Sequence, residues 1–180
     1  FAQRRVAVDI QNVRQLLAAS SLTAAQKSTF MARIDHASQE NEAQEIASNS
    51  IKTILPINNI HCEVMAVYGE MLAAQGVAPL TVWKLHRYAW LPFIAKPATD
   101  QPAALHIDLL KNEFRSDALL ITNAGGAEKT VILQLRNPPA NAKPGWLKVD
   151  SVAWTDTYQG IPVADALLPA SDEQGNYHIS

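Results

Sequence analysis

The spacing of apolar residues changes near residue 97, and this change separates the 180-residue sequence into two kinds of structure. Before it, apolar residues recur at steps of three and four, which is typical of one face of a helix. After it, short apolar runs alternate with turn residues, which is typical of antiparallel strands. We therefore expect an α+β protein with a helical region over residues 1–96 and an antiparallel β-sandwich over residues 97–180.

The helical region begins with two amphipathic patterns separated by a break at residues 20–22. Thr23 precedes Gln26 by three residues, the spacing of a capping box, so a second helix should begin there. Two antiparallel helices are the simplest outcome. Their apolar stripes are Val6, Ile10, Val13 and Leu17 in the first helix and Phe30, Ile34 and Ala37 in the second.

A third helix is expected after Asn59, with Gly76 as its C-terminal stop. Residues 38–50 between the second and third helices are polar, which favours a solvated helix end or a mobile segment. The aromatic stretch at 81–94 fits a helix or a strand equally well. The apolar face of the third helix consists of Val64, Val67, Tyr68, Met71 and Leu72.

The second half contains five short apolar runs that we interpret as strands. We expect the second and third runs to pair as a hairpin around the turn at Asn123–Gly126, because these residues tolerate positive φ angles. Residues 118–121 are apolar on both faces, so one face should meet the sandwich core and the other a neighbouring element or domain. The five runs are 105–110, 118–123, 130–136, 146–154 and 177–179.

Charge and hydropathy exclude some classes of partner. The net charge is −2 and no block of Lys or Arg is present, so we expect no nucleic acid partner. The longest apolar runs are far shorter than the roughly 18 residues needed to cross a bilayer, so we expect no membrane partner. Cys62 is the single cysteine, which excludes an intrachain disulfide, and its apolar helical setting favours a small buried hydrophobe over a reactive thiol.

Glu113, Arg115 and Asp117 form the first candidate for chemistry. Residues two apart share one face of a strand, so two carboxylates would flank a guanidinium and could bind sugar hydroxyls or act as an acid/base pair. The alternative is an ion cluster at the start of a strand, with the arginine held by both carboxylates. We favour the ion cluster, because structural ion pairs are common in proteins.

Trp83, Arg87, Tyr88 and Trp90 form the second candidate. Their rings, beside a guanidinium, could stack on a sugar or a base. The alternative, which we favour, is that Trp83, Trp90 and Phe93 pack the junction between the two halves, because large aromatic side chains are most often buried.

Trp154 and Asp156 form the last candidate, at the end of a predicted strand. Asp156 could bind a ligand or Ca²⁺ beside the neighbouring threonines, but we favour a turn in which these side chains bond their own backbone. The five histidines are scattered, and the sequence contains no zinc signature, phosphate-binding glycine loop or nucleophile elbow. We therefore expect no metal and no cofactor.

Two segments of the second half resemble a known family. Residues 111–123 and 149–156, with Pro162–Ala164, resemble the β-sandwich modules that lie beside catalytic barrels in large bacterial proteins related to glycoside hydrolases. The resemblance covers residues 105–180. It implies a non-catalytic partner of a barrel, secreted or periplasmic, that contacts a neighbouring domain of a longer chain and carbohydrate. No catalytic residue is carried over, because the barrel motifs are absent from these residues.

Three functions remain open from the sequence. The first is an accessory module of a larger carbohydrate-processing protein, and the absence of an initiator Met before Phe1 and of a turn signal after residue 179 leads us to expect that both ends are cut. The second is a carbohydrate-binding module, which would use exposed aromatics. The third is a small hydrolase that uses Glu113 and Asp117 as paired carboxylates. The aromatics for the second function are Trp83, Tyr88, Trp90, Trp146 and Trp154.

Overall fold

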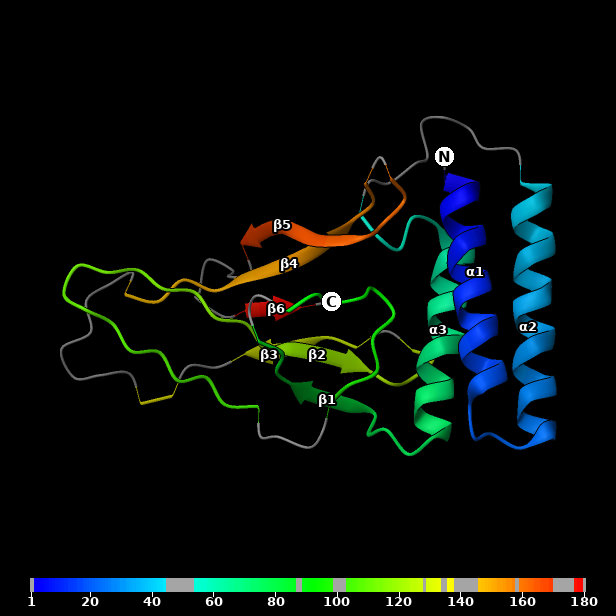
Figure 1. Ribbon diagram of the computed structural model, residues 1–180, viewed down its shortest axis with the longest axis horizontal. Coiled ribbons are helices and arrows are strands. Elements are labelled where there is room, and N and C mark those ends of the chain that lie inside the picture. Colours follow the sequence, from blue (N-terminus) through cyan, green and yellow to red (C-terminus); the bar gives the residue numbers. More distant parts are fainter. Residues whose placement is uncertain are drawn as a thin grey trace.

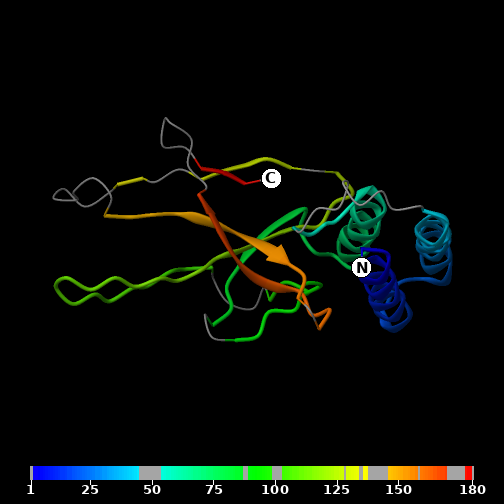
Figure 2. The same cartoon turned by 90° about the horizontal axis from the view of Figure 1, so that it is seen from above.

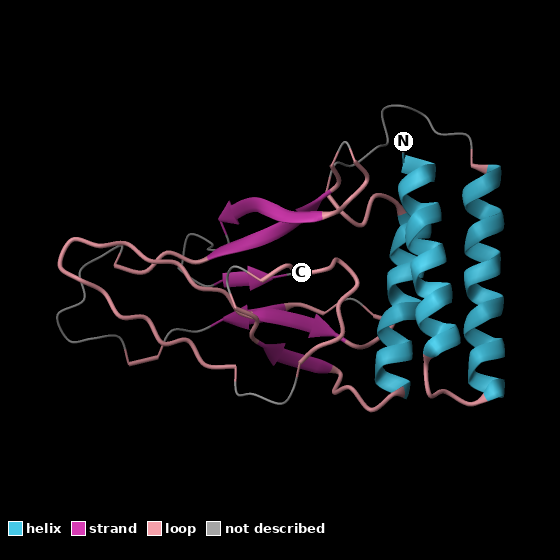
Figure 3. Ribbon diagram, in the orientation of Figure 1, coloured by secondary structure: helices cyan, strands magenta, loops and turns pink. Residues whose placement is uncertain are grey.

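The fold is α+β, with the helices at one end of the molecule and the strands at the other (Figures 1 and 3). Helices α1 (Ala2–Ala19), α2 (Ala24–Ala43) and α3 (Asn59–Ala74) lie side by side. The computed structural model describes residues 2–44, 54–86, 89–98, 103–127, 129–133, 136–137, 146–157 and 159–169, and the backbone alone of 177–179.

The main hydrophobic core lies between the three helices. The predicted stripes of α1 and α2 are buried in it, and Val64, Val67 and Met71 of α3 join them. The predicted helices and their apolar faces are confirmed. The apolar side chains that α1 and α2 bury in this core are Val6, Ile10, Val13, Leu17, Phe30, Ile34 and Ala37.

Local capping fixes where α2 and α3 begin. The Gln26 amide donates to Thr23 Oγ1 at 3.3 Å and the Thr23 amide donates to Gln26 Oε1 at 3.0 Å, which confirms the capping box. Asn58 caps α3 by accepting from the His61 amide at 2.9 Å. Gly76 follows α3 with φ +85°, a left-handed conformation that glycine adopts without strain, so the predicted stop is also confirmed.

Six strands form three antiparallel pairs in the described part of the chain. β1 (Leu80–Trp83) pairs with β2 (Leu120–Asn123), and β4 (Asp150–Thr155) pairs with β5 (Val163–Pro169). The third pair is β3 (Val131–Leu133) with β6 (Tyr177–Ile179). The packing of these pairs into a sandwich stays a prediction.

The predicted hairpin between 118–123 and 130–136 is wrong. β2 pairs with β1, with Val82 opposite Ile121, and β3 pairs with β6. The turn after β2 lies instead against α3, where a Cβ atom on Gly69 would be 2.9 Å from the Gly125 carbonyl oxygen. An apolar pattern specifies which face of a strand is buried, but it leaves the partner strand open, and here the helix holds the turn.

Three other strand assignments differ from the structure. Residues 105–110 form no strand, and β4 begins at Asp150 although a strand was expected from Trp146. β5 was not predicted as a strand. Within the ambiguous stretch at 81–94, the described residues are in β1 up to Trp83 and form neither helix nor strand beyond it. The β1–β2 pair joins segments on both sides of residue 97.

A second, smaller apolar cluster connects the N-terminal end of α1 to β4. Ala2, Leu55 and Ile57 are buried there, and Phe93 and Trp154 pack against them. The Leu55 amide donates to the Trp154 carbonyl at 2.9 Å. This cluster positions the end of β4 beside α1 and α3.

None of the described helices has the length and apolar character needed to cross a bilayer.

Candidate functional site

The best-defined polar site is a buried cluster of Arg5 and Asp9 from α1 with His61 from α3. The Arg5 Nε donates to Asp9 Oδ2 at 2.9 Å, and Arg5 Nη2 also contacts Asp9 Oδ1. The three side chains are at most 2% exposed. We call these residues, with Asp156, the buried ion cluster.

The hydrogen bonds of His61 define its tautomer. Its Nδ1 accepts a hydrogen bond from the Ile57 amide at 3.2 Å, so the ring proton lies on Nε2. Nε2 is 3.0 Å from Asp9 Oδ2, although it is poorly aligned for a hydrogen bond. The imidazole is thus fixed on one side by backbone and on the other by the carboxylate.

The loop after β4 closes the cluster from the β half. Arg5 Nη1 donates to the Gly160 carbonyl at 2.5 Å and lies 3.8 Å from Asp156 Oδ1. Asp156 accepts from the Thr157 amide at 2.9 Å, and Thr157 Oγ1 donates to the Ile161 carbonyl at 2.8 Å. The predicted turn around Asp156 is confirmed, and the structure adds an ion pair with Arg5 that the sequence did not predict.

Aromatic rings cover the His61 side of the cluster. Phe93 meets His61 edge-to-face with ring centroids 5.9 Å apart, and Trp154 meets Phe93 in the same way at 5.2 Å. Phe93 therefore packs the junction between the two halves, as predicted.

Electrostatics favour the charged form of Asp9. Burial by itself raises its pKa, but the contacts with His61 and Arg5 outweigh burial and hold the pKa of Asp9 below its ordinary value. Because the side chains are buried and already paired, a solute cannot reach them in this conformation. The arrangement can tie α1, α3 and the loop after β4 together, and we assign it no catalytic step.

The spacing of Arg5 and Asp9 is a sequence signal for this cluster. Arg5 and Asp9 are four residues apart, and each adjoins a member of the buried stripe, Val6 and Ile10. Two opposite charges on the apolar side of a helix predict a buried ion pair, because an unpaired buried charge is costly.

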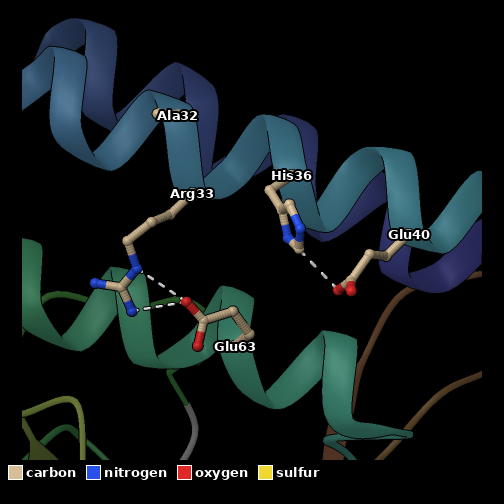
Figure 4. A pocket seen from close by; sticks show the side chains of 5 residues that line it. All are labelled: Ala32, Arg33, His36, Glu40 and Glu63. Carbon is tan, nitrogen blue, oxygen red and sulfur yellow. Dashed lines mark hydrogen bonds and ion pairs between the residues drawn. The ribbon is translucent and has the colours of Figure 1, made fainter.

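A second polar group lies on the surface between α2 and α3 (Figure 4). Arg33 contacts Glu63 Oε1 through Nε at 2.9 Å and Nη2 at 2.7 Å, and Glu70 Oε2 through Nη1 at 2.5 Å. The hydrogen bonds from Arg33 to Glu70 and Glu63 raise the pKa of this guanidinium. Arg33 and Glu63 line an open pocket with Ala32, His36 and Glu40. In this pocket Arg33 is paired with Glu63, and His36 Nδ1 lies 3.7 Å from Glu40 Oε2.

The predicted carboxylate pair is divided between different partners. Glu113 accepts hydrogen bonds from the Leu110 amide at 2.9 Å and from Arg115 Nε at 2.7 Å. Both bonds lower the pKa of Glu113, and the bond from Leu110 has the larger effect. Asp117 pairs with Lys84 Nζ at 2.7 Å. None of these residues lies in a strand. The Glu113–Arg115 pair occurs as expected, and Asp117 has Lys84 as a partner that the sequence did not suggest.

The aromatic candidates from the sequence lie in different environments in the structure. Trp83 is buried, and its Nε1 donates to Thr122 Oγ1 at 2.9 Å within the β1–β2 pair. Trp154 packs on Phe93, and Trp146 is 49% exposed. Trp90 is 63% exposed, so the expectation that it packs the junction is wrong. Arg87 and Tyr88 lie outside the described residues.

The expectation for Cys62 is wrong, because its side chain is exposed. The turn of α3 that buries His61 directs the next residue outwards, and the apolar face of this helix does not extend to position 62. Within the described residues, no set of three or more His, Cys, Asp or Glu side chains is placed to bind one metal ion.

Comparison with known proteins adds no relative: no family model, curated protein or solved structure matches this chain.

Proposed function

We propose that this chain is a non-catalytic accessory module that packs against a neighbouring domain of a larger carbohydrate-processing protein. The observation that carries this proposal is the contrast between the two halves. The helices have a closed core, while large apolar side chains on every described strand pair are exposed to solvent.

The exposed apolar side chains are spread over the strands. They include Leu80 and Val82 of β1, Ile132 of β3, and Leu167 of β5. Soluble monomers seldom leave extensive apolar surface uncovered, so such surface is typical of a contact with another domain. A neighbouring domain that covered these residues would supply the burial that two-stranded sheets lack on their own.

The β-sandwich belongs to the same proposal. Isolated two-stranded pairs are marginally stable in water, and packing them face to face, or against a partner, removes their apolar sides from water. The carbohydrate-processing context rests on the resemblance of residues 105–180 to modules beside catalytic barrels. The charged candidates support a non-catalytic role, because Glu113 and Asp117 each have a partner within the chain.

Hydrogen exchange tests the proposal, with the chain measured alone and within the protein that its source produces. We expect the amides of β1, β2, β4 and β5 to exchange more slowly in the source protein, and those of α1–α3 to serve as an unchanged internal control. Equal protection of the strands in both samples would refute a docked β half. A source protein whose mass equals that of the chain alone would refute it as well.

Carbohydrate binding by the chain itself is a second candidate, favoured by the exposure of Trp90 and Trp146. Indole rings exposed on a surface can stack on sugar rings. Titration with a panel of polysaccharides should then change the tryptophan fluorescence, and Trp90→Ala should weaken the change while Phe114→Ala, at an exposed ring elsewhere, should not. Fluorescence that stays constant across the panel would exclude this candidate.

A further inference from the structure

A long arm formed by residues 103–119 projects from the β half, away from the helices (Figures 1 and 2). Its tip is a defined turn: the Glu113 amide donates to the Leu110 carbonyl at 3.1 Å, and the Leu110 amide donates to Glu113 Oε2 at 2.9 Å. Asn112 has φ +65° in this turn. The tip therefore fixes where the first limb, residues 103–109, ends.

The first limb has unused hydrogen-bonding capacity. No backbone hydrogen bond joins residues 103–109 to another residue in the described part of the chain. Leu105, Ile107 and Leu109 are 40–56% exposed, and the side chains of His106 and Asp108 are 88% and 89% exposed. Alternate residues of a strand share a face, so pairing as a strand would place the three apolar residues on one face and the two polar residues on the other. Within one chain, His106 Nε2 lies 3.3 Å from Asp108 Oδ1, and pairing would exchange this contact for the same contact between copies. Such a segment is a ready template for pairing with another strand.

The order of these five residues is self-complementary. In an antiparallel pair of two identical limbs centred on Ile107, each Leu105 faces Leu109 of the other copy, and the two Ile107 side chains face each other. Each His106 then faces Asp108 of the other copy, which places an acid opposite a base. The match of apolar to apolar and of base to acid holds over residues 105–109.

Other registers lose this match. A parallel in-register pair would place Asp108 against Asp108, which is unfavourable. A shift by one residue would place polar residues opposite apolar ones, and a shift by two would place His106 against His106. The charge pattern therefore selects a second copy of this chain in one antiparallel register.

We propose that the first limb of the arm pairs with the same limb of a second copy, and that this strand pair makes the chain a symmetric dimer. The same surface patch serves on both copies, as two-fold symmetry requires. The contact is short, so the dimer is weak and depends on protein concentration. This inference goes beyond the accessory role, which concerns a different domain and the strands β1–β5, and it can fail while that role stands.

Sedimentation velocity over a series of protein concentrations tests the dimer. We expect a monomer–dimer equilibrium, and Ile107→Lys should weaken dimerisation at least tenfold, because it places two like charges in contact at the centre. Ile132→Lys, at an exposed position of β3, is the matched control and should leave the equilibrium unchanged. Ile107 is outside both apolar clusters, so the variant should keep the helical circular dichroism of the parent. A chain that stays monomeric at millimolar concentration, or a dimer that Ile107→Lys leaves intact, would overturn the proposal.

Charge exchange tests the register. Asp108→Lys alone should weaken the dimer, because lysine would then face His106. Adding His106→Asp should restore it to within a few-fold of the parent, because aspartate would then face lysine across the pair. A double variant as weak as the single one would rule out this register.

Cysteine crosslinking gives an independent readout in a Cys62→Ser background, which removes the exposed native thiol. Ile107→Cys should form a disulfide-linked dimer under mild oxidation, because position 107 faces itself. Leu105→Cys should crosslink far more slowly, because it faces position 109. Equal crosslinking at 105 and 107 would indicate a parallel or random association and would contradict the proposed pairing.

Discussion

Replacing Asp9 by Asn tests whether the buried ion cluster holds α1, α3 and the loop after β4 together. The carboxylate accepts from Arg5 at 2.9 Å through Oδ2, contacts Arg5 again through Oδ1, and accepts from Asn12 Nδ2 at 3.3 Å. An asparagine side chain would keep one acceptor oxygen and replace the other by an NH₂ group, which is itself a donor and would face these donors. It would also remove the negative charge beside Arg5.

The expected loss is about 3 kcal/mol of unfolding free energy. Removing one partner of a buried ion pair costs about 3–5 kcal/mol. The lower end applies here, because Arg5 keeps the Gly160 carbonyl at 2.5 Å and Asp156 at 3.8 Å. With a urea m-value of about 2 kcal/mol/M, the midpoint should fall by roughly 1.5 M.

Urea unfolding followed by circular dichroism measures this change, with Asp35→Asn as the matched control. Asp35 pairs with Arg14 at 2.6 Å, but its side chain is 51% exposed, so its loss should cost at most about 1 kcal/mol. If Asp9→Asn costs no more than Asp35→Asn, the buried ion cluster does not stabilise the fold and our reasoning is wrong.

The pH dependence of the stability difference between the parent and Asp9→Asn also tests the role of Asp9. The pKa of Asp9 is lower in the folded chain than in the unfolded chain, so its charge stabilises the fold fully above the unfolded pKa, about 3.9. This stability is lost as the pH falls through the lower, folded pKa. The difference between the parent and Asp9→Asn should therefore be constant from pH 8 to 5 and shrink only in acid below about pH 4. A difference that grows towards acid would contradict the assignment.

Three further substitutions test the packing and capping, each by urea unfolding. Gly69→Ala should lower the free energy of unfolding by about 1 kcal/mol, because a Cβ 2.9 Å from the Gly125 oxygen forces a shift that outweighs the helix-propensity gain of alanine. An increase in stability would refute the close contact. Phe93→Ala should lower the free energy of unfolding by roughly 2–3 kcal/mol. Phe114→Ala, at a ring that is 98% exposed, should change it by no more than about 0.5 kcal/mol. Equal effects would refute the role of Phe93 at the junction. Thr23→Ala should cost about 1 kcal/mol through loss of the capping box, and no change would show that α2 begins without it.

The sequence alone specified the helical half, because the signals that define it are local. A buried stripe at steps of three and four, the Thr23 cap and the stop at Gly76 each act within a few residues of their own position. These features predicted α1, α2 and α3 and their buried faces. The same local logic recovered the turn at Asp156, whose side chain bonds the next amide.

Only the tertiary structure decided the strand partners and the contacts of the Arg5–Asp9 pair with His61 and the loop after β4. Residues 118–123 contain a strand, as expected, but an alternating or apolar run carries no information about which of several strands it will pair with, and β1 was chosen over β3. Arg5 meets Gly160 and Asp156 only after the chain has folded back from its second half. Such pairings depend on contacts between distant segments, and the free energy that selects them comes from the whole packed arrangement rather than from any local pattern.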